Sequence, residues 1–319
     1  MNAKLPLIIP LLALIATSAG CGGAAAPPVS DVKLKAVELN RRGEKAVSTA
    51  DYQKALVLYG EALRLNRGID DHDGVGVNLI NLASVHTAMG NADSALPLLD
   101  EILDSKVYRF GPETSAHALL LKGSLTARKG DDRQGLADAI TLLDRALSTC
   151  GECTHAGAIY NQKALLTLRR GRANVNDETP APRRETGERI REAREFIMEA
   201  RALADKALAI NRAASDRVNE ADSLRISAAA AAAMGRYADA KQLYAEALAL
   251  DKSLGKGFRV VDDLIGLAKV AIKEVSANDG SKTEAERFLL RAKQAAKAAG
   301  DNAGEKEADA LLKEFFTPK

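Results

Sequence analysis

Apolar and small residues recur along this chain at the spacing of amphipathic helices, in pairs of runs separated by short polar turns. The stretch Ala221–Asp251 shows the pattern most clearly. Leu224, Ala228 and Ala231 precede a turn at Gly235, and a second set follows it at the same spacing: Ala240, Leu243, Tyr244, Ala247 and Leu248. Positions three, four and seven apart share one face of a helix. The pattern therefore predicts an antiparallel pair of helices joined at Gly235.

The same pattern returns along most of the chain. Matching turn positions are Ala50, Gly90, Gly130, Gly171, Gly235 and Gly280, of which the first four are 40, 40 and 41 residues apart. Seven residues before each turn the chain needs a small residue, because two helices cross there: Gly43, Ala83, Gly123, Ala164 and Ala228. The last unit departs from this rule with Lys273. A period of this length indicates stacked helical hairpins.

The fourth unit departs from the spacing in a different way. The apolar triplet of its second helix arrives 17 residues late, as Ala193, Ile197 and Ala200. The intervening stretch contains Pro180 and Pro182 among polar neighbours, which favours a loop. The sequence therefore predicts a surface loop inserted at about residues 172–187.

The repeat unit resembles the tetratricopeptide repeat, through the small residue Ala228, Gly235-Arg236-Tyr237 at the turn, and Ala240, Tyr244 and Ala247 in the second helix. The stretch Asp73–Leu103 is similar to the longer variants, of roughly 40 residues, found in kinesin light chain and related adaptors. This resemblance implies an all-α fold: a right-handed superhelical solenoid of about six hairpins over residues 32–319, closed by a capping helix at Ala303–Phe316.

In that family the first helix of each hairpin lines a concave groove that receives an extended peptide or a partner helix. The resemblance places in this groove the residues three before and one after the small position: Asn40, Glu44, Ile80, Ser84, Leu120, Ser124, Asn161, Leu165, Arg225 and Ala229. It implies a groove that is apolar in the middle, with amides able to hydrogen-bond a peptide backbone. Core packing is the alternative interpretation of Ile80, Leu120 and Leu165, because inter-helix contacts need apolar residues at the same spacing.

The first twenty residues have the pattern of an export signal. Lys4 precedes the apolar run Leu5–Ala16, and small residues then lead to Cys21. A short basic region, an apolar region and a small-residue cleavage site are typical of a signal peptide, here residues 1–20. The run is too short to span a membrane with polar flanks.

The residues around the cleavage site resemble a bacterial lipoprotein signal, Ser18-Ala19-Gly20-Cys21, although that family usually has Leu or Val where Ser18 stands. The resemblance implies that Cys21 becomes the acylated N-terminus and that the following residues, to Asp31, form a flexible linker. Gly22 replaces the Asp that tends to hold such lipoproteins at the inner membrane. In a Gram-negative cell this implies an outer-membrane anchor that faces the periplasm.

Composition and charge narrow the class of function. The chain has 319 residues, 4% aromatic and without Trp, which suits a solenoid because each hairpin packs only on its neighbours. Its 45 basic and 43 acidic residues are spread without blocks, which argues against a nucleic-acid partner. It contains no GxSxG, HExxH, Walker or GxGxxG motif, and His72, His86 and His117 lack ligands or catalytic partners at suitable spacing. The sequence predicts a protein that is not an enzyme and uses no cofactor or metal.

One short stretch, Cys150-Gly-Glu-Cys153-Thr-His155, invites a chemical interpretation. Thr154 separates the second cysteine from the histidine, which argues against covalent haem attachment. A disulfide that pins the turn between two repeats is the main interpretation for an oxidising compartment. Thioredoxin-like redox chemistry and metal binding remain alternatives.

These observations together favour a non-catalytic adaptor or scaffold, anchored in the bacterial envelope by lipid and presenting a groove to a protein partner. Envelope lipoproteins that serve outer-membrane protein insertion, or pilus and secretin assembly, are the analogues. Two alternatives stay open: a redox or metal protein that uses Cys150 and Cys153, and a small-molecule-binding solenoid with a closed apolar pocket.

Overall fold

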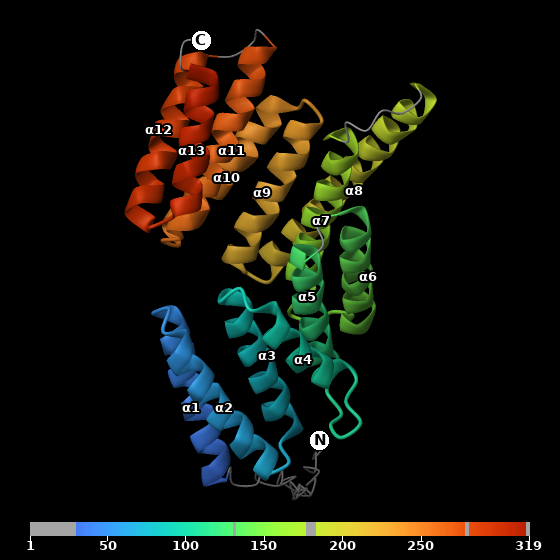
Figure 1. Cartoon of the computed structure of the whole chain (residues 1–319), viewed down its shortest axis with the longest axis vertical. Helices are drawn as coiled ribbons and strands as arrows, with labels where there is room; N and C mark the ends of the chain where they lie inside the picture. Colours follow the sequence, from blue (N-terminus) through green and yellow to red (C-terminus); the bar gives the residue numbers. More distant parts are fainter. Residues whose placement is uncertain (1–29, 130–131, 177–182, 278–280, 317–319) are drawn as a thin grey trace, which may run out of the picture.

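The computed structural model describes residues 30–129, 132–176, 183–277 and 281–316, and in these ranges it is built from helices joined by short turns (Figure 1). The predicted signal peptide, Cys21 and the linker to residue 29 lie outside the described residues. In chain order the helices are α1 (Asp31–Ser48), α2 (Tyr52–Gly68), α3 (His72–Ala88), α4 (Ala92–Leu103), α5 (Pro112–Lys129), α6 (Arg133–Cys150), α7 (Ala156–Asn176), α8 (Arg183–Ala213), α9 (Arg217–Ala233), α10 (Tyr237–Ser253), α11 (Gly257–Ser276), α12 (Lys282–Ala299) and α13 (Asn302–Phe316).

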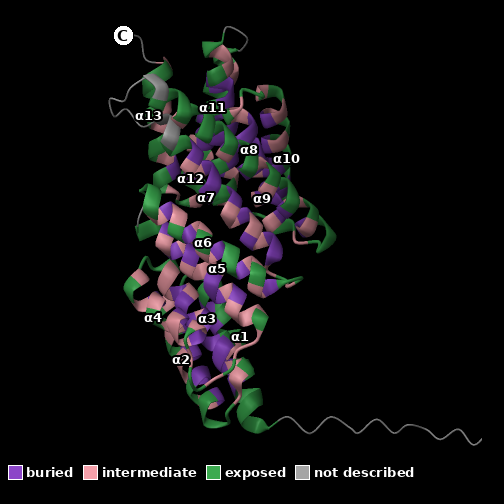
Figure 2. Ribbon diagram, turned by 90° about the vertical axis from the view of Figure 1, so that its right-hand side faces the viewer, coloured by how far each residue is buried: buried purple, intermediate pink, exposed green. Residues whose placement is uncertain are grey.

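The helices form six hairpins, from α1–α2 to α11–α12, and α13 packs on the last one. Each helix contacts its neighbours in the chain, and the first helices of adjoining hairpins also touch, from α1 against α3 to α11 against α13. Within the described ranges, no second helix contacts the second helix of the next hairpin. The stack therefore curves with its first helices on the inner side. The predicted all-α solenoid of six hairpins and a capping helix is confirmed, and buried residues run along its length (Figure 2).

The turns use backbone conformations that small residues tolerate. Ala50, Gly90 and Gly235 have positive φ angles of 57°, 76° and 76°, and they end the first helix of their hairpins at the predicted positions. Gly130 and Gly280 lie outside the described residues. Most connections between hairpins, and the one before α13, also contain a residue with positive φ: Asp70, Gly151, Ser215, Gly255 and Gly300; the connection from α4 to α5 does not. This conformation stops each helix and reverses the chain.

The predicted crossing points are confirmed by their packing. A Cβ on Gly43 would lie 2.4 Å from Cε1 of Tyr59, so the ring of Tyr59 occupies the space that a side chain would need. Ala83, Ala164 and Ala228 are fully buried at the corresponding positions. Small residues at these points let the two helices of a hairpin approach closely, which replaces a large aromatic core.

The last hairpin also has a small residue where its two helices cross, but at a different position from the one that the spacing predicted. Lys273, which the spacing placed at the crossing, is exposed, and that placement was wrong. Helix α11 has 20 residues, whereas α9 has 17. Counting seven residues back from Gly280 therefore did not reach the crossing point in α11. Ala271 lies at the equivalent distance from the helix end and is fully buried.

The described residues of the predicted loop, 172–176 and 183–187, are helical, which corrects the sequence interpretation there. Helix α7 continues through Gly171 to Asn176, and α8 begins at Arg183 and runs for 31 residues. The two prolines fall at 180 and 182, between the helices, so the inserted residues before and after them lengthen both helices. Figure 1 shows this hairpin reaching past its neighbours as an arm. Residues 177–182 lie outside the described ranges.

Across the described ranges, no helix is both long and apolar enough to cross a bilayer.

Candidate functional site

A cleft of about 1010 Å³ lies on the inner side of the solenoid, in its C-terminal two thirds. Its walls come from α5, α7, α9, α11 and α13, and Ile197 and Tyr244 reach it from α8 and α10. Leu165 and Phe315 line it while remaining 38% and 40% exposed. The cleft therefore offers uncovered apolar surface on the concave face.

The predicted groove residues divide into two sets. The residues from the third, fourth and fifth hairpins line the cleft: Leu120, Ser124, Asn161, Leu165, Arg225 and Ala229. Asn40, Glu44, Ile80 and Ser84, from the first two hairpins, do not. Ile80 is only 6% exposed and belongs to the core of hairpins one and two, so the core interpretation is correct for that residue. The cleft thus brings together the predicted groove residues of hairpins three to five.

Asn40 takes part in a hydrogen-bond cluster at the junction between hairpins one and two. Asn78 of α3 donates to Oδ1 of Asn40 in α1 at 2.5 Å, and Asn66 at the end of α2 donates to Oδ1 of Asn78 at 2.7 Å. Asn66 and Asn78 are buried. The three side chains hydrogen-bond one another where α1, α2 and α3 meet. These amide groups therefore stabilise the junction between the hairpins.

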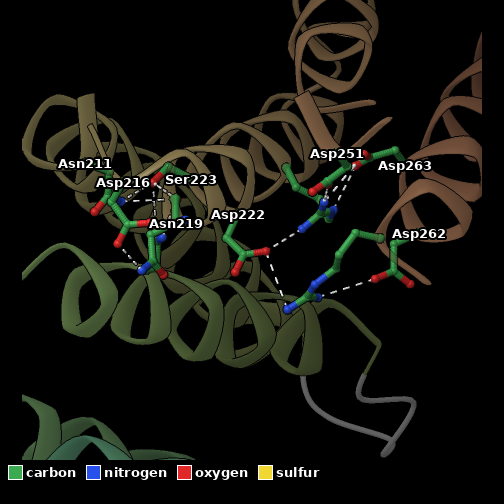
Figure 3. A network of polar contacts seen from close by, with 11 residues as sticks. Asn211, Asp216, Asn219, Asp222, Ser223, Asp251, Asp262 and Asp263 are labelled. Atoms are coloured by element: carbon green, nitrogen blue, oxygen red, sulfur yellow. Dashed lines mark hydrogen bonds and ion pairs between the residues drawn. The ribbon is translucent and has the colours of Figure 1, made fainter. Parts of the chain in front are cut away.

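An equivalent cluster joins hairpins four and five. Ser223 of α9 donates to Oδ1 of Asn161 in α7 at 2.7 Å and accepts from Nδ2 of Asn211 in α8 at 3.0 Å (Figure 3). Nδ2 of Asn161 donates to the carbonyl of Asn219 at 2.8 Å. Asn161 is 5% exposed, so its amide, expected to hydrogen-bond a peptide backbone, is already occupied.

At the next junction the same three positions carry charges. Arg225 of α9 contacts Asp251 of α10, and its Nε donates to Oδ1 of Asp263 in α11 at 2.8 Å (Figure 3). Nη1 of Arg225 also reaches Oδ1 of Asp222 at 2.5 Å. Asp251 and Asp263 are 1% and 0% exposed, so Arg225 is the cation that compensates two fully buried carboxylates. Arg225 therefore holds the hairpins together, although it borders the cleft.

The three clusters share a spacing that the sequence analysis missed. The residue at the end of the second helix precedes its partner in the next first helix by 12 positions in Asn66–Asn78, Asn211–Ser223 and Asp251–Asp263. Polar residues at this spacing were visible in the sequence. Only the structure shows that they meet.

The charged junction contains more acid than base. Arg259 lies within 3.5 Å of Asp222 and 3.4 Å of Asp262, so two arginines face four carboxylates. Burial raises the pKa of Asp263, and although Arg225 opposes this, the neighbouring Asp251 carboxylate adds to the rise. Burial also raises the pKa of Asp262. Because a raised pKa favours the neutral acid, this cluster carries less negative charge than its excess of two carboxyl groups alone would give.

The CGEC turn lies outside the cleft. Cys150 and Cys153 form a disulfide with their Cα atoms 5.2 Å apart, at the turn between α6 and α7. Glu113 of α5 accepts from the backbone nitrogen of Thr154 at 3.2 Å, which ties the turn to the third hairpin. No group of three His, Cys, Asp or Glu side chains in the described ranges is arranged to hold a metal ion. With both thiols oxidised, the disulfide closes the turn between α6 and α7, which is the structural role.

His117, which the sequence left without a partner, stacks on His155 with ring centroids 4.1 Å apart. Burial, and then the charge of His155, lowers the pKa of His117 to about 4. The folded state thus disfavours the proton that the unfolded chain binds near pH 6.5.

We expect His117 to reduce stability as pH falls from about 6.5 towards 4, because the unfolded state takes up a proton that the folded state resists. Thermal midpoints measured across this interval should fall less steeply for H117Q than for the parent. H72Q, which changes a half-exposed histidine, should follow the parent. Equal slopes for parent and H117Q would contradict this assignment.

The comparisons with known proteins cover the chain unevenly. Residues 39–106, which run from α1 past the end of α4, match the tetratricopeptide repeat family model. No curated protein matches the chain. Among solved structures, the complex of the TPR2AB domain of yeast Sti1 with pHSP90 is 17% identical, covers 86% of this chain and 96% of its own, and has a TM-score of 0.36.

Two further solved structures are similar at the same level. NprR in complex with its cognate peptide NprX is 18% identical, covers 91% of this chain and 86% of its own, and has a TM-score of 0.37. The human IFIT1 dimer with m7Gppp-AAAA is 14% identical, covers 88% of this chain and 63% of its own, and also has a TM-score of 0.37. The family match thus covers the first two hairpins, and the description of the remaining hairpins rests on the chain's own packing.

Proposed function

We propose that this protein is a non-catalytic interaction scaffold that receives a segment of a partner protein in the cleft between α5 and α13. The supporting observation is the apolar surface that the concave side leaves uncovered, at Leu165 and Phe315 above all. Helix-in-groove recognition depends on such apolar anchors. The charged residues around the cleft favour a protein segment over a purely apolar small molecule, which needs a more enclosed pocket.

The partner test compares two surface variants of the full-length protein. In L165E a charge enters the cleft at a residue that is already 38% exposed, so the fold should survive while apolar docking is lost. V57E changes a valine that is 70% exposed on α2, away from the cleft, and is the matched control. After crosslinking in cells, we expect one protein to be captured by the parent and V57E and lost from L165E. Equal capture of this protein by the parent, V57E and L165E would show that the cleft is not the docking site.

We further propose that the protein is an envelope lipoprotein, anchored through Cys21 and held at the outer membrane facing the periplasm. The signal-like residues 1–20 and the small residues before Cys21 support this location. Several acyl chains on one cysteine give stable anchoring, because each buried CH₂ contributes roughly 0.8 kcal/mol.

Labelling with palmitate and fractionating the cells tests the anchor. We expect the parent to carry label and sediment with outer membranes, and C21A to carry none and to leave the membrane fraction. A parent protein without label, or a C21A variant that keeps it, would contradict lipidation at this residue. The cleft proposal does not depend on the outcome.

A further inference from the structure

The first helices that line the cleft present their residues in matched layers. The lining residues recur at the first, fifth, eighth and twelfth positions of one helical face in α9 and α11, for example Asp222, Ile226, Ala229 and Ala233, and Asp262, Gly266, Lys269 and Lys273. Residues at this spacing lie above one another on one side of a helix. Eleven residues at 1.5 Å per residue place the outer layers about 16 Å apart.

The layer nearest the start of these helices is acidic. Asp222 and Asp262 both line the cleft, and their side chains are 24% and 49% exposed. Arg259 bridges them, and Arg225 also contacts Asp222; Figure 3 shows the acidic residues of this cluster. Asp251 and Asp263 both contact Arg225 alone, so the cluster sets four carboxyl groups against two arginines and keeps surplus negative charge.

The layer at the opposite end is basic. Arg172 of α7 and Lys273 of α11 line the cleft there, both exposed. Nη2 of Arg172 donates to the carbonyl of Ala229 at 3.1 Å, and no described carboxylate forms an ion pair with Arg172 or Lys273. Lys269 is paired with Glu307 of α13 at 2.6 Å, whereas Glu314 of α13 is an unpaired acid near this end. Among the described residues that line this end, Arg172 and Lys273 have no carboxylate partner and Glu314 is the one unpaired acid, so these three side chains sum to a positive charge.

The middle of the cleft separates the two charged layers. Leu165 is exposed there, and Ile226 and Ile265 form the wall behind it at 8% and 4% exposure. An occupant that follows the direction of α9 and α11 therefore meets acid, then apolar surface, then base.

We propose that the cleft selects a bipolar partner segment: an apolar stretch of about three helical turns with a basic residue at one end and an acidic residue at the other. Charge complementarity supports this occupant, since a uniformly charged segment would meet like charge at one end of the cleft. The inference rests on the proposed function and specifies the chemistry of its partner.

Three synthetic peptides of equal length test this inference on the full mature protein by fluorescence anisotropy. They share a Leu/Ala core and carry Lys at one end and Glu at the other, Glu at both ends, or Lys at both ends. We expect the bipolar peptide to bind about fivefold tighter than either uniform peptide at low salt, and the difference to shrink as salt screens the charges. Equal binding of all three, or tighter binding of a uniform peptide, overturns the inference.

Two cleft variants should change the preference in opposite ways. R172Q K273Q should lose the discrimination against the Lys-ended peptide, and D262N should lose the discrimination against the Glu-ended peptide. R42Q K54Q removes the same charge from exposed positions on α1 and α2, outside the cleft, and should behave as the parent. An unchanged preference in both cleft variants overturns the assignment of these residues.

L165E separates failure of this inference from failure of the cleft proposal. If L165E weakens all three peptides and the parent binds them equally, the cleft remains the docking site and only the bipolar partner is rejected. If L165E leaves the binding of every peptide unchanged, or the parent binds none of them, the proposed cleft and the bipolar partner are both overturned.

Discussion

Replacing Arg225 with methionine is expected to destabilise the C-terminal hairpins by about 3–5 kcal/mol, the range found when one partner of a buried ion pair is removed. Arg225 is the cation that contacts Asp251 and Asp263, which are 1% and 0% exposed. Methionine keeps much of the volume but leaves both carboxylates without compensation. Urea unfolding followed by circular dichroism, with hydrogen exchange to locate the affected helices, measures the loss.

Neutralising the carboxylates should restore most of that stability. In R225M D251N D263N no buried charge remains uncompensated, so we expect the triple variant to lie closer to the parent than R225M does. R259M is the matched control, because Arg259 is 50% exposed and its ion pairs at the rim contribute at most about 1 kcal/mol. An R225M protein as stable as R259M would show that the junction does not depend on Arg225.

Replacing Ile80 with glutamate is expected to have the next largest effect, a loss of about 3–5 kcal/mol in the N-terminal hairpins. Ile80 is 6% exposed within the core of α1 to α4, so the substitution removes apolar contacts and forces a carboxylate into an apolar site. Hydrogen exchange should show lost protection in α1–α4, while α9–α13 stay protected because hairpins in a solenoid contact only their neighbours.

L165E is the contrasting variant, although the resemblance placed both Leu165 and Ile80 in the groove. Leu165 is 38% exposed and faces the cleft, so we expect L165E to unfold at nearly the same urea concentration as the parent. Similar losses in both variants would mean that Leu165 is also core and that the cleft is narrower than the structure shows.

The repeat itself could be predicted because it depends on local spacing. Small residues such as Gly43 and Ala228 mark helix crossings, and positive-φ residues such as Gly90 and Gly235 mark turns, so the hairpins follow from the sequence. The arm at α7–α8 could not, since prolines 180 and 182 suggested a loop while the residues on either side of them extend the helices.

The site was harder to predict because it depends on contacts between repeats. Family geometry placed Asn40, Asn161 and Arg225 in the groove, yet their polar groups are taken up by the next helices. The bipolar cleft could not be predicted, because Arg172 and Lys273 come from different hairpins and only the stacking of the hairpins places both in one cleft. The positions implied by the family resemblance therefore fall on the helices that line the cleft. For Asn40, Asn161 and Arg225, they did not predict the contacts that the side chains make between hairpins.

Site-specific photo-crosslinking in cells shows whether the cleft is the surface on which the partner docks. A photoreactive amino acid is placed at position 165 in the cleft or at position 57 on α2, where the native valine is more exposed than Leu165. We expect a discrete crosslinked partner from position 165 in intact cells and none from position 57. Crosslinks to the same partner from position 57 but not from position 165 would place the docking surface outside the cleft.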